Sequence, residues 1–177
     1  MREKKLRSWR RIAAETRGSQ IAEAALVLPI VFMLLFGIIW FGRAYNIYTT
    51  ITYAAREGAQ VAAQPSCATC GNTTNNATAV YNRVADVLRA SHINPGQIGS
   101  YSPNPAPTGG TCGTMATATQ GNVKVYTNVQ LNPGSVGPQA CGVVVSFEYP
   151  YQFNFPFTSL NKQLVLLKAA VQMQAEN

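Results

Sequence analysis

Hydrophobic residues gather first in one long uninterrupted run. From Ala24 to Gly42 the chain reads AALVLPIVFMLLFGIIWFG, without a charged residue. A helix rises about 1.5 Å per residue, so a run of this length crosses a hydrocarbon core of about 30 Å. Aromatic residues cluster at its exit, and Arg43 is the first charge beyond it. This pattern predicts a retained membrane helix, because a secretory signal peptide has a shorter apolar region followed by a cleavage site.

The helical pattern continues past the apolar run. No helix breaker occurs between Arg43 and Pro65. Small or apolar residues recur there at helical intervals: Ala44, Ile47, Ile51, Ala54, Gly58 and Ala62. We expect one helix over about 19–63, with its first half in lipid and its second half against a folded domain. Pro29 lies inside this helix and cannot donate a backbone hydrogen bond, so a kink is expected there.

A short second helix and two loops are predicted next. Residues 79–90 place their valines on one face, with Asp86 and Arg89 spaced as an i, i+3 ion pair on the other. Residues 64–78 and 93–121 are rich in Pro, Gly, Ser, Thr and Asn. We interpret both as loops rather than strands.

Alternating patterns predict strands in the last third of the chain. In 123–131 the odd-numbered residues form the buried face, and 143–155 alternates in the same way. Pro150 interrupts that second run, which is therefore either an edge strand or two strands that meet at a bend. The run 163–174 is predicted as the last strand, with a helix as the less favoured option. Consecutive strands after helices predict an α+β class, with an antiparallel sheet packed on helices.

Positive charge is concentrated at the N-terminus. The chain has a formal charge of +7, and residues 1–17 carry +5 of it. Basic residues directly before an apolar run hold a leader in the cytoplasm, whereas nucleic-acid binding needs basic groups spread over a folded face. We therefore expect a cytoplasmic N-terminus, an extracytoplasmic C-terminal domain and no nucleic-acid partner.

All four cysteines come after the apolar run: Cys67, Cys70, Cys112 and Cys141. If the N-terminus is cytoplasmic, they lie where disulfides persist. Spacing alone leaves three pairings open. The preferred one is Cys67 with Cys70 and Cys112 with Cys141, which closes a tight loop and ties the long loop to a strand.

Constellations typical of enzymes are not recognisable in the sequence. The CxxC of Cys67 and Cys70 has no βαβ context, and 28 residues separate the other two cysteines, so neither redox chemistry nor zinc binding is predicted. His92 is the single histidine, and the acidic residues are few and scattered. We expect no enzymatic activity, metal, cofactor or small-molecule substrate.

A processing motif precedes the apolar run in RGSQIAEAALVLP, from Arg17 to Pro29. A Gly followed after four residues by a Glu is the pattern that prepilin peptidases cut after the Gly. Gly18 has no side chain and helps leave the bond to Ser19 extended and accessible. Glu23 is costly on a membrane helix unless it is paired or protonated, which favours a role in assembly with the new amine of a neighbour's Ser19. The alternative is that Glu23 lies at the boundary and extends its carboxylate to water.

The segment 17–63 resembles the TadE-like pilus proteins, through its Gly and Glu, ALVLP, the FGRA at the membrane exit and the AAREGA near its end. The resemblance implies a minor pseudopilin of the Tad (Flp) pilus machinery in the bacterial inner membrane, used in adherence and fibre biogenesis. Its implied partners are a prepilin peptidase, other pilin-like subunits and the Tad secretion machinery.

The expected division is a leader (1–18), a TadE-like helix (19–63) and an extracytoplasmic domain (64–177). The alternative function is an uncleaved, signal-anchored envelope module that binds a ligand or a partner protein.

Overall fold

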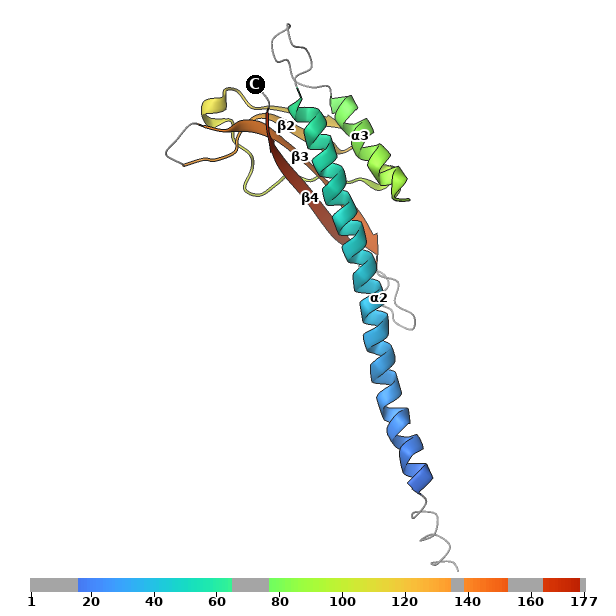
Figure 1. Ribbon diagram of the computed structural model, residues 1–177. Coiled ribbons are helices and arrows are strands. Elements are labelled where there is room, and N and C mark those ends of the chain that lie inside the picture. Colours follow the sequence, from blue (N-terminus) through green and yellow to red (C-terminus); the bar gives the residue numbers. More distant parts are fainter. Residues whose placement is uncertain (1–15, 65–76, 135–138, 153–163, 176–177) are drawn as a thin grey trace, which may run out of the picture. The chain divides into compact units, whose positions relative to one another are not determined.

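The structure, a computed structural model, describes residues 16–64, 77–134, 139–152 and 164–175 (Figure 1). The chain divides into two compact units, Met1–Arg43 and Ala44–Asn177, and each is described by itself. The first unit contributes one helical segment. The second contains the sheet and the remaining helices, so every packing contact described below belongs to it.

The first described element is the helix α2 (Thr16–Ala63). It is assigned as one helix through Pro29, and it ends just before Pro65, as predicted. The part up to Arg43 belongs to the first unit, and the part from Ala44 packs in the second. Whether the axis bends at Pro29 stays a prediction.

The second unit is an α+β domain around one antiparallel sheet, as predicted from the alternating patterns. Its strands are arranged in the order of the sequence, and each pairs with the next: β1 (Ala116–Gln120), β2 (Val123–Gln130), β3 (Cys141–Gln152) and β4 (Leu164–Gln174). The last run is therefore a strand and not a helix. The helix α3 (Ala77–Ala90) precedes the sheet, and its Asp86 and Arg89 form the predicted pair at 2.9 Å.

The prediction that 93–121 is only a loop was wrong. It contains β1 and two 3-10 turns, η1 (Pro95–Gln97) and η2 (Gly110–Cys112). All five residues of β1 are exposed, and alternating Ala and Thr offer no contrast between apolar and polar faces, so the sequence contains no strand signal here. Pairing with β2 creates the strand, through a two-residue turn at Gly121 and Asn122, which both have positive φ.

The prediction that all odd-numbered residues of 123–131 share one face was also wrong. Between Tyr126 and Val129 the register advances three residues along β2 but only two along β3, and Asn128 has φ 55°. This is a β-bulge, and its extra residue moves the remainder of the strand to the other face. Val129 consequently packs with Tyr126 and Val144, on the face opposite to Val125.

Pro150 neither ends β3 nor places it at the edge of the sheet. The strand continues through Pro150, which is paired with Leu166 of β4. Glu148 N–H donates to Gly99 O at 2.9 Å, away from β4. In a strand, the backbone N–H and C=O groups of residues 148 and 150 point to the same side, which here is the side away from β4. The N–H that Pro150 lacks would therefore also point away from β4. Among the described residues, β2 is paired with β3 no further than Ser146, so Pro150 removes no ladder bond.

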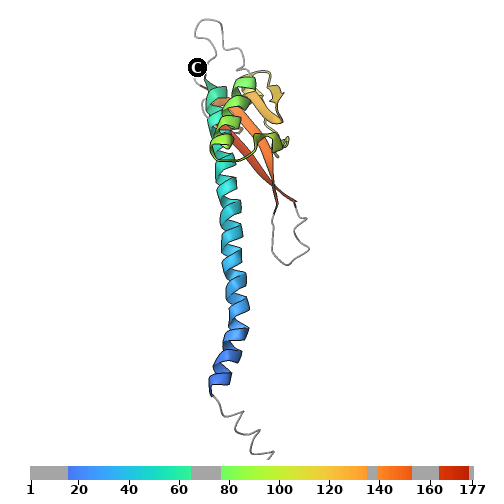
Figure 2. The same cartoon turned by 90° about the vertical axis from the view of Figure 1, so that its right-hand side faces the viewer.

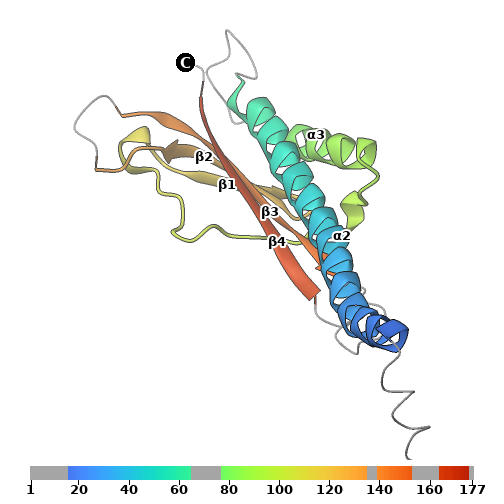
Figure 3. The same cartoon turned by 60° about the horizontal axis from the view of Figure 1, so that its bottom comes forward.

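The main core lies between the sheet and the two helices, α2 and α3, which lie on one side of it (Figure 3). Its largest fully buried side chain is Phe147 of β3. The other face of the sheet holds a smaller cluster and is crossed by the segment 99–115. Ser146 Oγ donates to the Tyr101 carbonyl at 2.9 Å, and Gln130 N–H donates to the Thr108 carbonyl at 2.8 Å. The central strand β3 is therefore covered on both faces.

The second half of α2 packs closely because most of its buried residues, from Ala54 onward, are small. Ala54, Ala55 and Ala59 are fully buried. A Cβ added at Gly58 would lie 2.7 Å from Cγ2 of Val84 on α3, closer than real Cβ contacts. The stripe of small residues predicted on this helix therefore lets both α3 and the sheet approach its backbone closely.

A disulfide joins η2 to the start of β3. Cys112 and Cys141 are bonded, with their Cα atoms 5.6 Å apart and a sequence separation of 29. This is the preferred pairing for these two residues. Cys67 and Cys70 lie outside the described residues, and so do Phe153 and Phe155 of the predicted second strand.

Gly58→Leu should destabilise the C-terminal unit by about 1–3 kcal/mol, the usual cost of overpacking a filled interior. The matched control is Gly42→Leu, because nothing lies within 4 Å of a Cβ placed there. Thermal unfolding of the full chain in detergent measures both. Equal melting temperatures for the two variants would contradict the close helix packing at Gly58.

Replacing Cys112 and Cys141 by Ser should lower the free energy of unfolding by about 3–4 kcal/mol, because an unfolded chain without this bond gains the entropy of a loop of about 30 residues. Denaturant titration of the oxidised full chain checks this. A loss below about 1 kcal/mol would show that the bond adds little to the contacts that hold 99–115 on the sheet.

Candidate functional site

The predicted processing bond lies inside α2 and not before it. The helix begins at Thr16, so the backbone of Gly18 and Ser19 is helical. The expectation that Gly18 leaves this bond extended is therefore not met. Both residues belong to the first turn, where the backbone N–H groups have no intrahelical partner. Unwinding this terminal turn breaks only the hydrogen bonds that its carbonyls accept from the next turn, so the bond can still become accessible.

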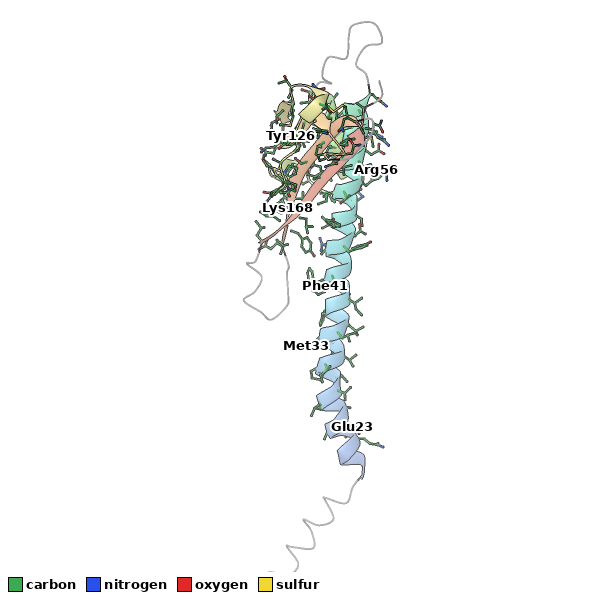
Figure 4. The ribbon with its side chains drawn as sticks, turned by 90° about the vertical axis from the view of Figure 1, so that its left-hand side faces the viewer. Glu23, Met33, Phe41, Arg56, Tyr126 and Lys168 are labelled. Atoms are coloured by element: carbon green, nitrogen blue, oxygen red, sulfur yellow. A yellow bond between two sulfur atoms is a disulfide. The ribbon has the colours of Figure 1, made fainter. Side chains whose placement is uncertain are left out.

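Glu23 lies one turn further along α2, directly before the apolar run (Figure 4). Its side chain is exposed. Within residues 16–64, 77–134, 139–152 and 164–175, no cation forms an ion pair with it. Its position leaves the carboxylate available to a group from outside the chain.

The apolar run exposes large side chains on all sides of the helix, as Met33 and Phe41 illustrate in Figure 4. These exposed residues recur through every turn: Leu26, Val27, Leu28, Ile30, Val31, Phe32, Met33, Leu34, Leu35, Phe36, Ile38, Ile39 and Phe41. A helix that is apolar all round belongs in lipid or inside other protein. In the part of the chain that the structure describes, α2 is the one helix long and apolar enough to cross a membrane.

The AAREGA stretch, residues 54–59, has a structural role. Its alanines and Gly58 form the surface on which α3 and the sheet pack, whereas Arg56 is exposed. Glu57 accepts hydrogen bonds from Nε and Nη2 of Arg83 on α3, at 3.1 and 2.5 Å. The carboxylate therefore fixes α3 against α2.

The pKa values of this pair are explained by the contact. Hydrogen bonding to Arg83 holds the pKa of Glu57 below its ordinary value, with a second contribution from Tyr53, and the same carboxylate raises the pKa of Arg83. Glu57 is 13% exposed and Arg83 51% exposed, so solvent screens part of the attraction. The sequence pattern does not predict that Arg83 contacts Glu57. A separation of 26 residues leaves no spacing signal.

The remaining candidate residues do not converge on a chemical site. Among the described residues, no group of three His, Cys, Asp or Glu could hold a metal ion. His92 is exposed at the end of α3, and Cys112 is bonded to Cys141. The residues with a candidate function thus lie along the beginning of α2.

Comparison with known proteins gives one family. Residues 18–60 match the family of TadE-like proteins, over less than half of the chain. No curated protein and no solved structure matches. The matched segment begins at Gly18, includes Glu23 and the whole apolar run, and ends just after the AAREGA stretch. The segment from residue 18 to residue 60 is therefore TadE-like, as its motifs predict.

Proposed function

We propose that this chain is a pilin-like structural and assembly protein, a minor pseudopilin of a bacterial Tad (Flp) pilus, and not an enzyme. The observation that carries the proposal is the TadE-like match, because it joins Gly18, Glu23 and the apolar helix in one segment. TadE-like proteins are associated with Tad pilus systems. The proposed roles are therefore adherence and surface-fibre biogenesis.

The apolar run anchors the protein in the inner membrane. Its large side chains are exposed, and burying apolar surface contributes about 25 cal/mol per Å². The basic residues before it favour a cytoplasmic N-terminus, so the C-terminal unit would be extracytoplasmic. An extracytoplasmic location agrees with the disulfide between Cys112 and Cys141.

A prepilin peptidase would cut between Gly18 and Ser19. The first turn of α2 has to unwind for this, and because the turn is terminal only the bonds that its carbonyls accept from the next turn are lost. The cut leaves a positively charged amine on Ser19. It also removes the basic leader that would otherwise hold the helix at the membrane.

The exposed carboxylate of Glu23 would then bind the Ser19 amine of a neighbouring subunit. Both charges lie next to apolar helices, where the attraction is stronger than in water. In a fibre, the apolar sides of α2 would exchange lipid for the helices of other pilin-like subunits. Those subunits and the Tad secretion machinery are the proposed partners.

Protein isolated from its native membrane should begin at Ser19. Intact-mass measurement decides this, and a chain that retains Met1 to Gly18 would instead support an uncleaved, signal-anchored binding module. Gly18→Ala should reduce cleavage strongly because the added methyl group crowds the peptidase site. Gly37→Ala is the matched control in the same helix, where a Cβ meets nothing within 4 Å, and it should be cut normally.

Glu23→Gln should leave membrane insertion and cleavage unchanged but weaken association with pilin partners. Loss of one partner of a desolvated ion pair costs about 3–5 kcal/mol, which is about a hundredfold or greater loss of binding. Crosslinking in membranes measures the association, with Gln20→Ala as a control that removes an uncharged side chain nearby. Normal crosslinking of Glu23→Gln would remove Glu23 from assembly.

A further inference from the structure

The beginning of β4 carries an apolar surface that the proposed anchoring and assembly leave unused. Leu164, Val165 and Leu166 are 58%, 39% and 45% exposed. Successive residues of a strand point to opposite faces of the sheet. Exposure of three in a row therefore means that β4 presents exposed apolar side chains on both of its faces at this end, whereas Tyr151, which pairs with Val165, is buried.

Polarity changes in order along the far face of β4. That face carries the residues Leu164, Leu166, Lys168, Ala170, Gln172 and Gln174. The two leucines come first, Lys168 comes next, and the glutamine amides are last. A strand rises about 3.4 Å per residue, so Lys168 lies about 7 Å from Leu166 along the strand. Lys168 is exposed, and its Nζ lies 5.0 Å from the centre of the Tyr101 ring. Apolar residues, then a cation beside an aromatic ring, then amides is the order of environments across a membrane interface.

The apolar end of β4 lies at the Ala44 end of the C-terminal unit. At the opposite end, Met173 and Ala63 line the same shallow hollow. From Met173 to Leu164 the strand covers about 30 Å, and from Ala63 to Ala44 the helix covers about 28 Å. Figure 1 shows β4 beside this part of α2, and in Figure 2 the strand slants away from the helix toward the strand's beginning. Leu164 of β4 and Ala44 of α2 are thus at about the same distance from the opposite end of the C-terminal unit.

We propose that the Leu164–Leu166 end of β4 rests in the interface of the bilayer that α2 crosses. This inference rests on the proposed anchoring, because Ala44 comes directly after Gly42 and Arg43, at the end of the apolar run. At the exit level of the helix, an apolar surface meets the boundary between headgroups and acyl chains. Lys168 would then lie at the level of anionic phosphates.

The depth of this contact is limited by the backbone. β4 is an edge strand, and among the described residues it pairs with β3 alone. Unpaired backbone groups cannot enter the hydrocarbon core, but water and headgroups can satisfy them at the interface. In water, an exposed apolar edge would instead promote aggregation. A shallow lipid contact satisfies both requirements.

Nitroxide labels on the full chain test the proposal in liposomes of phosphatidylethanolamine and phosphatidylglycerol. The label is placed at Leu166→Cys, with Gln172→Cys as the matched control on the same face of the same strand. A third label, at Leu34→Cys, reports on the apolar run. Collision with oxygen, which enters lipid, is compared with collision with a water-soluble nickel complex.

At Leu166 the ratio of oxygen to nickel collisions should be severalfold higher than at Gln172, and Leu34 should resemble Leu166. Nickel access at Leu166 equal to that at Gln172, with Leu34 still in lipid, would refute the contact and leave the anchoring intact. Protection of Leu166 from both agents would mean that protein covers it, and would also refute the contact. Nickel access at Leu34 would refute the proposed anchoring, and this inference with it. If Leu166→Cys fails to fold, Leu164→Cys gives the same readout.

Discussion

The rest of the structure depends on one constraint: the first half of α2 is apolar all round and exposes large side chains on every side. Large side chains from Leu26 to Phe41 are exposed. Such a helix is stable only in lipid or among other apolar helices. A pilin-like subunit would meet both environments, because the same surface would face lipid before assembly and neighbouring helices afterwards.

The second half of α2 packs against α3 and the sheet instead, through a different set of residues. From Ala54 onward, the buried residues of α2 are small, so α3 and the sheet approach the backbone closely at Gly58. Glu57 adds a polar contact to α3 through Arg83. This division is consistent with the extent of the family match, from Gly18 to residue 60. The matched segment includes the processing motif, the apolar run and the part of α2 on which α3 and the sheet pack.

Much of the fold could be predicted because helix breakers and alternation are local signals. Pro65 determines where α2 ends, and the pattern before Gln174 identifies β4. The errors arose where tertiary contacts decide. β1 exists because β2 pairs with it, and the bulge at Asn128 accompanies a hydrogen bond from its side chain to the Thr114 carbonyl at 3.0 Å. No spacing in the sequence reports either contact.

The candidate site shows the same limit. Gly18 and Glu23 could be identified because their spacing before an apolar run is a local pattern. The helical start at Thr16 and the pairing of Glu57 with Arg83 could not, because they depend on helix propagation and on packing between distant segments. The partner of Glu23 is proposed to lie on another chain, so neither the sequence nor the fold of one chain contains it.

The central claim is that the exposed apolar run is covered by lipid while the rest of α2 is covered by its own domain. Amide hydrogen exchange of the full chain in a lipid bilayer tests this directly. The account predicts slow exchange both in 24–42, which lipid shields, and in 47–63, which the core shields. Rapid exchange in 24–42 beside slow exchange in 47–63 would show a helix solvated by water, and would contradict it.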